Sequence, residues 1–364
     1  MTNRERIINT LMFKEVDRPP FFFAFGPWTE TEERWRKEGL EPGKSWDEGF
    51  GFDPGILSLE TVNLGYYPPF EEKILEDKGD SVIRIDYRGI ILEDRKDGGS
   101  IPKFIDYPVK TVSDWEKLKA ERLDPDDPGR FPSDWLELAK KYNEGDQAIQ
   151  IGDYPYGLFG TLRDMMGVEE LLVAFYDEPE MIKDMMGHLT DCWIRIYEKV
   201  CKDVKVDIIH MWEDMSGKQG SLISPAMIRE FMLPNYKKIK DFADAHGIMI
   251  FSLDTDGNCE ELVPLYMESG INFMYPFEVA AGSDIVSYRK RYPTLGIMGG
   301  IDKQEIAKGP EAIDRELERI AEMFKYKGYI PALDHLIHPE ISLEDFKYFV
   351  TKLKSYILGT VLAV

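Results

Sequence analysis

Acidic residues, and in one case a histidine, follow short apolar runs at six places between residues 147 and 335. The runs end near Asp153, at Glu213 and Asp214, at Asp254, at Glu278, at Asp302, and at Asp334 and His335. Carboxylates and imidazoles can transfer protons or bind a divalent metal. If these run ends meet in space, they form one site for acid/base or metal-assisted chemistry.

The stretches between the runs have a helical pattern, so short buried strands alternate with helices along the chain. This alternation is typical of βαβ units around a parallel sheet. Six such units over residues 147–364, with two more candidates upstream, predict an α/β fold of the (β/α)8, or TIM barrel, type. In that fold the loops after the strands converge over a packed core, so the acidic run ends are expected to face one another.

The first 130 residues depart from this regular pattern. Residues 1–18 predict an N-terminal helix with Thr2 as its N-cap, and Phe21–Phe25 is expected to be the first barrel strand. Residues 28–130 predict an excursion over the barrel mouth, with a β-hairpin at 81–93 followed by a linker helix. We therefore expect residues 1–364 to form a single barrel domain with an N-terminal helical extension and an inserted β-hairpin.

Composition narrows the class of protein. The net charge of -22 argues against a nucleic-acid partner or an anionic membrane surface, which would need clustered Lys and Arg. The chain has no apolar leader and no run of ~18 apolar residues, and its three cysteines form no CxxC pair. A cytoplasmic location is therefore expected.

Four segments resemble the uroporphyrinogen decarboxylase superfamily. They are RERIINTLMFKEVDRPPFFF at residues 4–23, SPAMIREFMLPNYKKI at 224–239, GGID at 299–302 and GYIPALDHLIHPEISLEDFKYFV at 328–350. The resemblance spans nearly the whole chain and implies a (β/α)8 barrel. It also implies one of two chemistries, which are decarboxylation of a porphyrinogen without a cofactor and zinc-dependent methyl transfer to or from a corrinoid protein.

The segment after the first predicted strand departs from the decarboxylases. That branch carries an arginine-rich signature there, because guanidinium groups bind the carboxylates of its substrate. This chain has AFGPWTETEERW at residues 24–35, which places Trp28 and several glutamates in that region. Arg163 stands where the family has a tyrosine after the third strand. Decarboxylation of uroporphyrinogen is therefore disfavoured.

The methyltransferase branch carries His-x-Cys at the end of the fifth strand and a cysteine after the last strand, which together bind zinc. Here the matching positions are Asp254-x-Asp256 and His335. The resemblance thus implies a site for a divalent metal, zinc before iron or manganese, that could polarise a substrate oxygen. Alternatively, Asp256 lies in a turn sequence that suits a helix N-cap.

Further residues are expected to complete the site. Glu213 and Glu278, with His335, are the candidates for general acid and base, although either glutamate could instead form a salt bridge at the rim. Six residues are expected to contact the substrate: Trp28, Asp153, Arg163, Trp212, Tyr275 and Asp302.

The resulting hypothesis is a methyltransferase that demethylates a small methylated compound and passes the methyl group to a corrinoid protein. The corrinoid must come from a partner chain, since this chain has no Asp-x-His-x-x-Gly motif. The resemblance also implies that two copies can pair into a homodimer. A decarboxylase or lyase for a porphyrinogen-like or smaller carboxylate, and a non-catalytic ligand-binding barrel, are the alternatives.

Overall fold

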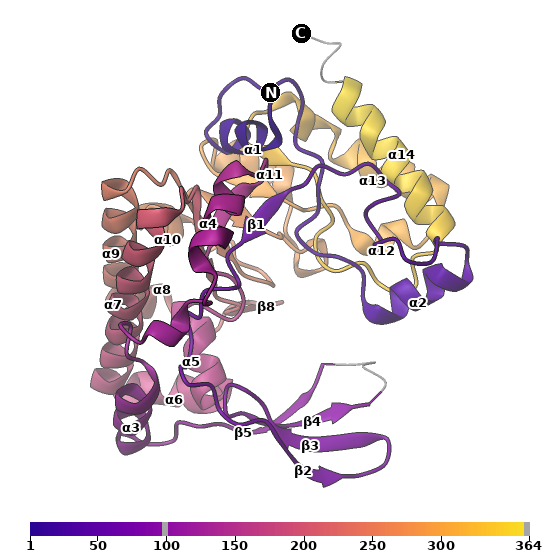
Figure 1. Ribbon diagram of the computed structural model, residues 1–364. Coiled ribbons are helices and arrows are strands. Elements are labelled where there is room, and N and C mark those ends of the chain that lie inside the picture. Colours follow the sequence, from indigo (N-terminus) through magenta and orange to yellow (C-terminus); the bar gives the residue numbers. More distant parts are fainter. Residues whose placement is uncertain (97–100, 360–364) are drawn as a thin grey trace.

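A computed structural model describes residues 1–96 and 101–359 of the chain (Figure 1). Residues 97–100, in the predicted excursion, and 360–364, at the end of the predicted barrel region, lie outside the described residues. The central element is a seven-stranded sheet in the order β1-β6-β7-β10-β11-β12-β13, in which every pair of neighbours is parallel. The strands are β1 (Ile56–Ser58), β6 (Ala148–Ile151), β7 (Ile208–Trp212), β10 (Ile250–Asp254), β11 (Phe273–Tyr275), β12 (Gly296–Met298) and β13 (Tyr329–Ile330).

The six runs predicted as strands are β6, β7, β10, β11, β12 and β13, and they lie side by side in sequence order. They are apolar almost throughout because both faces of the sheet are covered. The curled parallel sheet with helices around it confirms the α/β barrel fold.

Helices cover the outside of the sheet (Figure 1). They are α4 (Trp135–Glu144), α5 (Leu158–Met166), α6 (Val168–Asp177), α7 (Pro179–Asp203), α8 (Pro225–Met227), α9 (Leu233–Ala245), α10 (Val263–Glu268), α11 (Ile285–Arg291), α12 (Lys303–Ile306), α13 (Pro310–Arg319) and α14 (Leu343–Gly359). The long helix α7 shows why they pack, since Met181, Ile182, Met185, Met186 and Leu189 recur at helical spacing and are buried. The methionines of this helix therefore belong to the core.

The N-terminal helix α1 (Asn3–Leu11) closes the end of the barrel where the strands begin. Its start has the predicted capping box, in which Thr2 Oγ1 accepts from the Glu5 amide at 3.1 Å and Glu5 accepts from the Thr2 amide. Ile7 and Leu11 pack with Ala148, Ile208, Ile250 and Phe273, the first residues of four strands. The helix ends well before the predicted residue 18.

The prediction of a regular strand at Phe21–Phe25 is wrong. This segment is irregular, with a bend at Ala24 and Phe25. It and the next residue close the barrel through isolated hydrogen bonds, from the Asp53 amide to the Phe21 carbonyl at 2.7 Å and from the Ile337 amide to the Gly26 carbonyl at 3.1 Å. The strand that pairs with β6 is β1, which lies inside the predicted excursion. Its three residues are too few to give a pattern of alternation.

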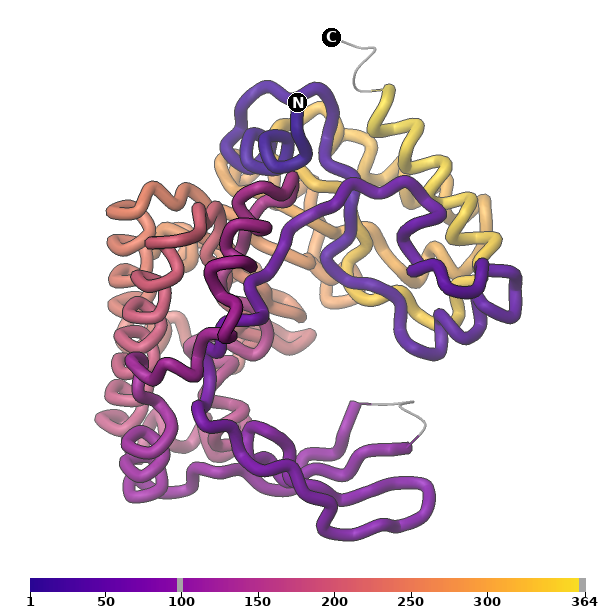
Figure 2. The backbone as a smooth tube through the Cα atoms, viewed as in Figure 1, coloured from indigo at the N-terminus to yellow at the C-terminus, as the bar shows by residue number. Residues whose placement is uncertain are grey.

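The inserted hairpin is confirmed and is part of a larger unit. Strands β2 (Lys73–Asp77), β3 (Ser81–Ile85), β4 (Ile91–Arg95) and β5 (Lys103–Asp106) form an antiparallel sheet that projects from the barrel (Figures 1 and 2). The turn between β3 and β4 contains Gly89 at φ 82°, and the predicted linker helix is α3 (Val112–Arg122). Arg88 of this turn donates to the Tyr154 hydroxyl at 2.8 Å, which ties the sheet to the barrel.

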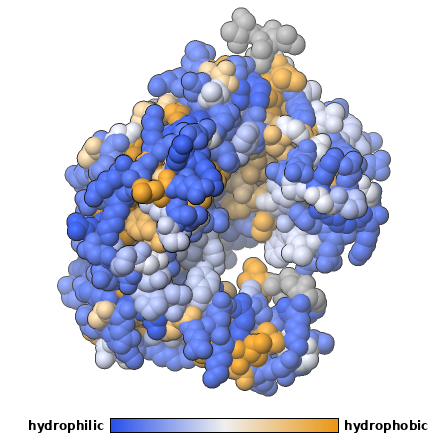
Figure 3. Space-filling model, in the orientation of Figure 1, coloured by the Kyte–Doolittle hydropathy of each residue, from blue (hydrophilic) through white to orange (hydrophobic). Residues whose placement is uncertain are grey.

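The molecule is hollowed between this sheet and the part that carries helix α2 (Thr29–Lys37) and α12 (Figure 3). A two-stranded ribbon, β8 (Ser216–Gly217) with β9 (Gly220–Ser221), follows β7. Within residues 1–96 and 101–359, none of the helices has the length and apolar character needed to cross a membrane.

Candidate active site

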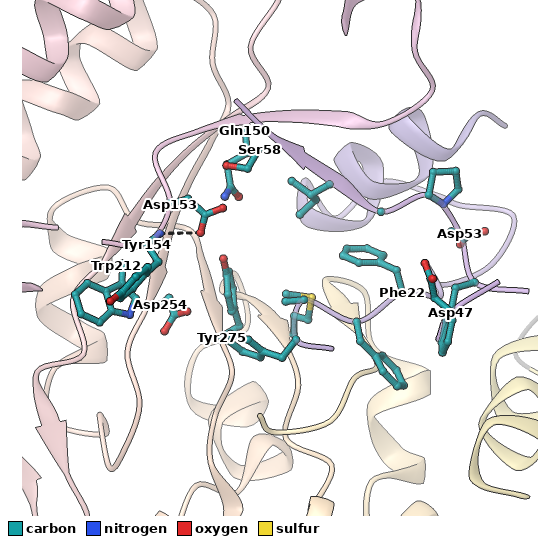
Figure 4. Close-up of a pocket in the computed structure, with 18 of the residues that line it drawn as sticks. Phe22, Asp47, Asp53, Ser58, Gln150, Asp153, Tyr154, Trp212, Asp254 and Tyr275 are labelled. Atoms are coloured by element: carbon teal, nitrogen blue, oxygen red, sulfur yellow. Dashed lines mark hydrogen bonds between the residues drawn. The ribbon is translucent and has the colours of Figure 1, made fainter. Parts of the chain in front are cut away.

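A cavity of about 340 Å³ lies at the carboxyl ends of the barrel strands (Figure 4). The last residues of five strands line it: Ser58, Trp212, Asp254, Tyr275 and Met298. The irregular segment that closes the barrel contributes three aromatic residues, Phe22, Phe23 and Phe25. This is the position at which barrel enzymes carry their chemistry.

Asp254 is the least satisfied group in the cavity. It is only 7% exposed, and within the described part of the chain no group donates a hydrogen bond to its carboxylate. Burial raises the pKa of Asp254 well above its ordinary value, and the negative charges of Asp256, Asp214, Asp153 and Glu278 raise it further. The carboxylate therefore lacks the cation or donors that a buried charge needs.

Asp153 lies near Asp254 at the same end of the cavity (Figure 4). Its Oδ1 accepts from the Tyr154 amide at 2.8 Å, and it makes no ion pair with a described residue. The other end contains Asp47 and Asp53, and Asp53 is paired with Arg18. The described lining thus contains four aspartates and no Lys or Arg.

Aromatic rings form the walls around the two unpaired carboxylates. Tyr154 packs edge-on against Trp212 at 4.7 Å between ring centroids, and Phe25 lies 6.0 Å from Tyr275. Cations or imidazoles already lie near one face of each ring, Arg163 at Trp212, Arg88 at Tyr154, His210 at Tyr275 and His335 at Phe25. The inner cavity therefore combines carboxylates with aromatic side chains.

Tyr275 is positioned by a buried histidine that the sequence did not single out. His210, in β7, stacks on the Tyr275 ring, and its Nε2 lies 3.1 Å from the Tyr275 hydroxyl. His210 Nδ1 lies 2.8 Å from Ser252 Oγ. Burial lowers the pKa of His210 to about 4, so the imidazole is neutral and can orient the tyrosine hydroxyl. The sequence signal for His210 was a histidine inside an apolar strand, in a chain that has only five histidines.

His335 and Asp256 form a pair beside the cavity. His335 Nε2 lies 3.2 Å from Asp256 Oδ2, and the imidazole stacks on Phe25, which lines the cavity, at 4.9 Å. Burial lowers the pKa of His335, but the hydrogen bond to Asp256 and its charge outweigh burial and raise the pKa overall. His335 is therefore held protonated beyond the range of an ordinary histidine.

Replacing Asp256 with asparagine is expected to lower the pKa of His335. The substitution removes the negative charge that raises this pKa and leaves the burial that lowers it. An NMR titration of the His335 ring should show the midpoint moving to lower pH. An unchanged midpoint would mean that another group holds the proton.

Glu278 lies between a backbone amide and a buried lysine. Its Oε2 accepts from the Gly257 amide at 3.0 Å, and its Oε1 lies 3.4 Å from Lys303 Nζ. The same lysine is 3.7 Å from Asp334, whose pKa is raised by burial and lowered by Lys303 to a smaller extent. Glu278 is thus part of an ion-pair network and not of the cavity lining.

Glu213 is outside the cavity, and its contacts are those of an anchor. It is fully buried and accepts hydrogen bonds from the amides of Leu158, Phe159 and Gly160 at the start of α5, and from the Tyr236 hydroxyl at 2.5 Å. Burial raises the pKa of Glu213 to about 7, although these four donors lower it. No acceptor site is left for a substrate proton.

Three residues expected to bind substrate also lie elsewhere. Arg163 donates to the Asp214 carbonyl at 2.7 Å and pairs with the Asp214 carboxylate. Asp302 caps α12 by accepting from the Gln304 amide at 2.8 Å. Trp28 packs edge-on against His338, outside the cavity lining. Asp153, Trp212 and Tyr275 are the expected contacts that do line the cavity.

The structure does not bring the three predicted metal ligands together. Asp256 contacts His335, but Asp254 faces the cavity, and the described residues contain no cluster of three or more His, Cys, Asp or Glu side chains suited to a metal ion. The residues present therefore do not fit the predicted zinc site.

The sequence model of the uroporphyrinogen decarboxylase (URO-D) family matches residues 87–356. The chain belongs to this family. Two curated family members are similar to it, both named uroporphyrinogen decarboxylase. The one from Rhodococcus erythropolis is 26% identical over 278 residues, which is 74% of this chain and 72% of the relative. The one from Rhodococcus jostii is 22% identical over 277 residues, with the same coverage.

A solved structure described as a methyltransferase from Methanosarcina mazei has the same fold as this URO-D family member. The TM-score is 0.63 at 16% identity, and the match covers 98% of this chain and 99% of the other. The barrel therefore extends over the described chain, including the part before residue 87 that the family model leaves out.

The turn before α5 in this URO-D family member has no room for a side chain. A Cβ at Gly157 would lie 1.7 Å from the Trp212 carbonyl oxygen. Gly157→Ala is therefore expected to displace α5 from β7 and lower the free energy of unfolding by about 2–4 kcal/mol. Chemical denaturation measures this loss. Gly187→Ala is the matched control, because a Cβ there meets nothing within 4 Å.

Proposed function

We propose that this URO-D family member is a methyltransferase that removes a methyl group from a small compound and passes it to a corrinoid protein. The observation that carries the proposal is the charge of the cavity. Its described lining has four aspartates and no Lys or Arg, so it repels the polycarboxylate that a porphyrinogen decarboxylase must bind. A substrate without carboxylates is needed.

The shape of the molecule supports the same proposal. The cavity lies at the carboxyl ends of the strands, and the molecule is hollowed between the β2–β5 sheet and the α2 and α12 region (Figure 3). The hollow leaves access for a cofactor presented by another protein. A corrinoid in its reduced state would supply the electron pair that forms the new bond to the methyl group.

The chain's own residues would bind and orient the methyl donor. Asp254 and Asp153 set the charge of the cavity, and the rings of Phe25, Tyr154 and Trp212 contribute apolar contacts to its wall. The Tyr275 hydroxyl is held by His210 at the cavity wall, where its oxygen can contact the bound donor. No step is assigned to a metal, because the predicted ligands do not converge.

The proposal is tested by methyl transfer from deuterated donors to chemically reduced cobalamin. The donors are tetramethylammonium, methanol and methoxybenzene, and mass spectrometry detects the labelled methyl group on cobalamin. Transfer that depends on the protein supports the proposal. Release of carbon dioxide from small carboxylic acids, with no methyl transfer from any donor, would replace it with a decarboxylase.

A further inference from the structure

We infer that the methyl donor is a small cation, a quaternary methylammonium compound bound between Asp254, Asp153 and the surrounding aromatic rings. This inference rests on the proposed methyl transfer and names its substrate class. Three features of the cavity carry it, which are an uncompensated charge, walls made of aromatic rings, and the electronic demand of the transfer step.

The first feature is the negative charge of carboxylates that have no cationic partner among the described residues. Asp254 and the four carboxylates whose charges act on it form a cluster of five. Three of the five already have a cationic partner: Asp214 pairs with Arg163, Asp256 with His335, and Glu278 with Lys303. Asp254 and Asp153 have no such partner among the described residues. A buried carboxylate is costly unless it is paired, so Asp254 in particular lacks one cation.

The second feature is that aromatic rings line the cavity beside the two carboxylates. A quaternary ammonium ion has no N–H to donate, and its charge is spread over methyl groups that pack well against the faces of aromatic rings. Phe25, Tyr275, Tyr154 and Trp212 supply such rings beside the two carboxylates. A cavity of about 340 Å³ is of the size of a small ligand site.

The same features disfavour other cations. A metal ion needs several converging oxygen or nitrogen ligands, and the described residues offer no cluster of three. A primary ammonium ion can donate to the carboxylate oxygens of Asp254 and Asp153, but it leaves the neighbouring rings without the methyl contacts that a quaternary ion makes.

The third feature is that a positive nitrogen removes the need for a Lewis acid. When the methyl group leaves, the C–N bond breaks and its electron pair stays on nitrogen, so the leaving group is a neutral tertiary amine. The methyl group bonds to the reduced corrinoid of the partner protein, which supplies both electrons of the new bond. The amine leaves as a neutral molecule, so no proton has to be transferred and no general acid is needed.

Calorimetric binding tests the inference without a corrinoid. The full chain is titrated with choline and with 3,3-dimethylbutan-1-ol, which has the same shape without the charge. Choline should bind, and the alcohol should bind about tenfold or more weakly. D254N and D153N should each weaken choline binding by about tenfold or more. D284N should bind choline as the native protein does, because Asp284 is an exposed helix cap and asparagine can keep its bond to the Val286 amide.

The binding result and the transfer result separate the two proposals. Equal binding of choline and the alcohol, or binding that D254N leaves unchanged, overturns the cationic substrate. Transfer from methanol or methoxybenzene with no choline binding keeps the methyltransferase and removes the methylammonium donor. Tight binding of zinc that D254N abolishes, with no binding of choline, would reassign the cavity to a metal. Choline binding with no transfer from any donor would keep the site and remove the proposed reaction.

Discussion

Replacing Asp254 with asparagine is expected to make the protein more stable while it removes the binding of a cationic substrate. The native carboxylate is buried among four other carboxylates and accepts no hydrogen bond from a described group. A neutral side chain of the same size removes this repulsion and the cost of desolvating the charge. The free energy of unfolding at pH 8 should rise by about 1–2 kcal/mol, the range typical when a strained functional group is relieved.

The gain should depend on pH with a defined sign. Burial raises the pKa of Asp254 in the folded protein above its value in the unfolded chain, so the folded state holds the proton more tightly. Native stability therefore falls as the pH rises from the ordinary carboxyl pKa of about 4 through the raised pKa. The D254N protein lacks this part of the decline, so the two curves should converge at low pH and separate at high pH.

Urea denaturation at a series of pH values measures both effects. D284N serves as the matched control, since it removes the same charge from an exposed position. If D254N were less stable than the native protein at pH 8, the Asp254 carboxylate would have to make a contact that stabilises the barrel. Asp254 would then no longer be a free carboxylate that binds a cationic substrate.

The largest loss of stability is expected for Glu213→Ala. The carboxylate accepts from three amides at the start of α5 and from Tyr236, and all four donors are buried. Alanine leaves these donors without an acceptor, which costs about 3–5 kcal/mol even though one buried charge is removed. Thermal and urea unfolding report the loss.

Tyr236→Phe provides the graded comparison. It removes one of the four donors and keeps the ring, so the expected loss is about 1 kcal/mol. If Glu213→Ala kept native stability and lost methyl transfer, the anchoring role would be wrong and the sequence-based prediction of an acid/base role would return. Loss of stability with activity retained at low temperature would support the anchor.

The barrel could be predicted because its strands are buried on both faces. Runs such as Ile208–Trp212 and Ile250–Asp254 are apolar for that reason and stand out between helices. The segment Phe21–Phe25 has the same composition but pairs only through isolated hydrogen bonds, and composition cannot report pairing. The strand Ile56–Ser58 has three residues and gives no period to detect.

The site could be predicted only by position along the chain. The ends of the predicted strands indicated that Asp153, Trp212, Asp254 and Tyr275 lie near one another, and all four line one cavity, because those positions follow from the fold. The direction in which each side chain points could not be predicted from its position in the sequence. Glu213 shows this, since it comes one residue after the end of β7 but its carboxylate points to the start of α5. Partners from distant segments decide such cases, as Lys303 does for Glu278.

Helix α1 fills the end of the barrel where the strands begin, so ligands reach the cavity from the side that faces the hollow (Figures 1 and 3). Under the proposed methyl transfer, a small methyl donor and a large corrinoid protein would share one entrance to the cavity. The donor would have to enter before the corrinoid protein docks, and the demethylated product could leave only after that protein dissociates. Steady-state kinetics should therefore follow a compulsory order, with excess docking protein acting as an inhibitor against a scarce donor.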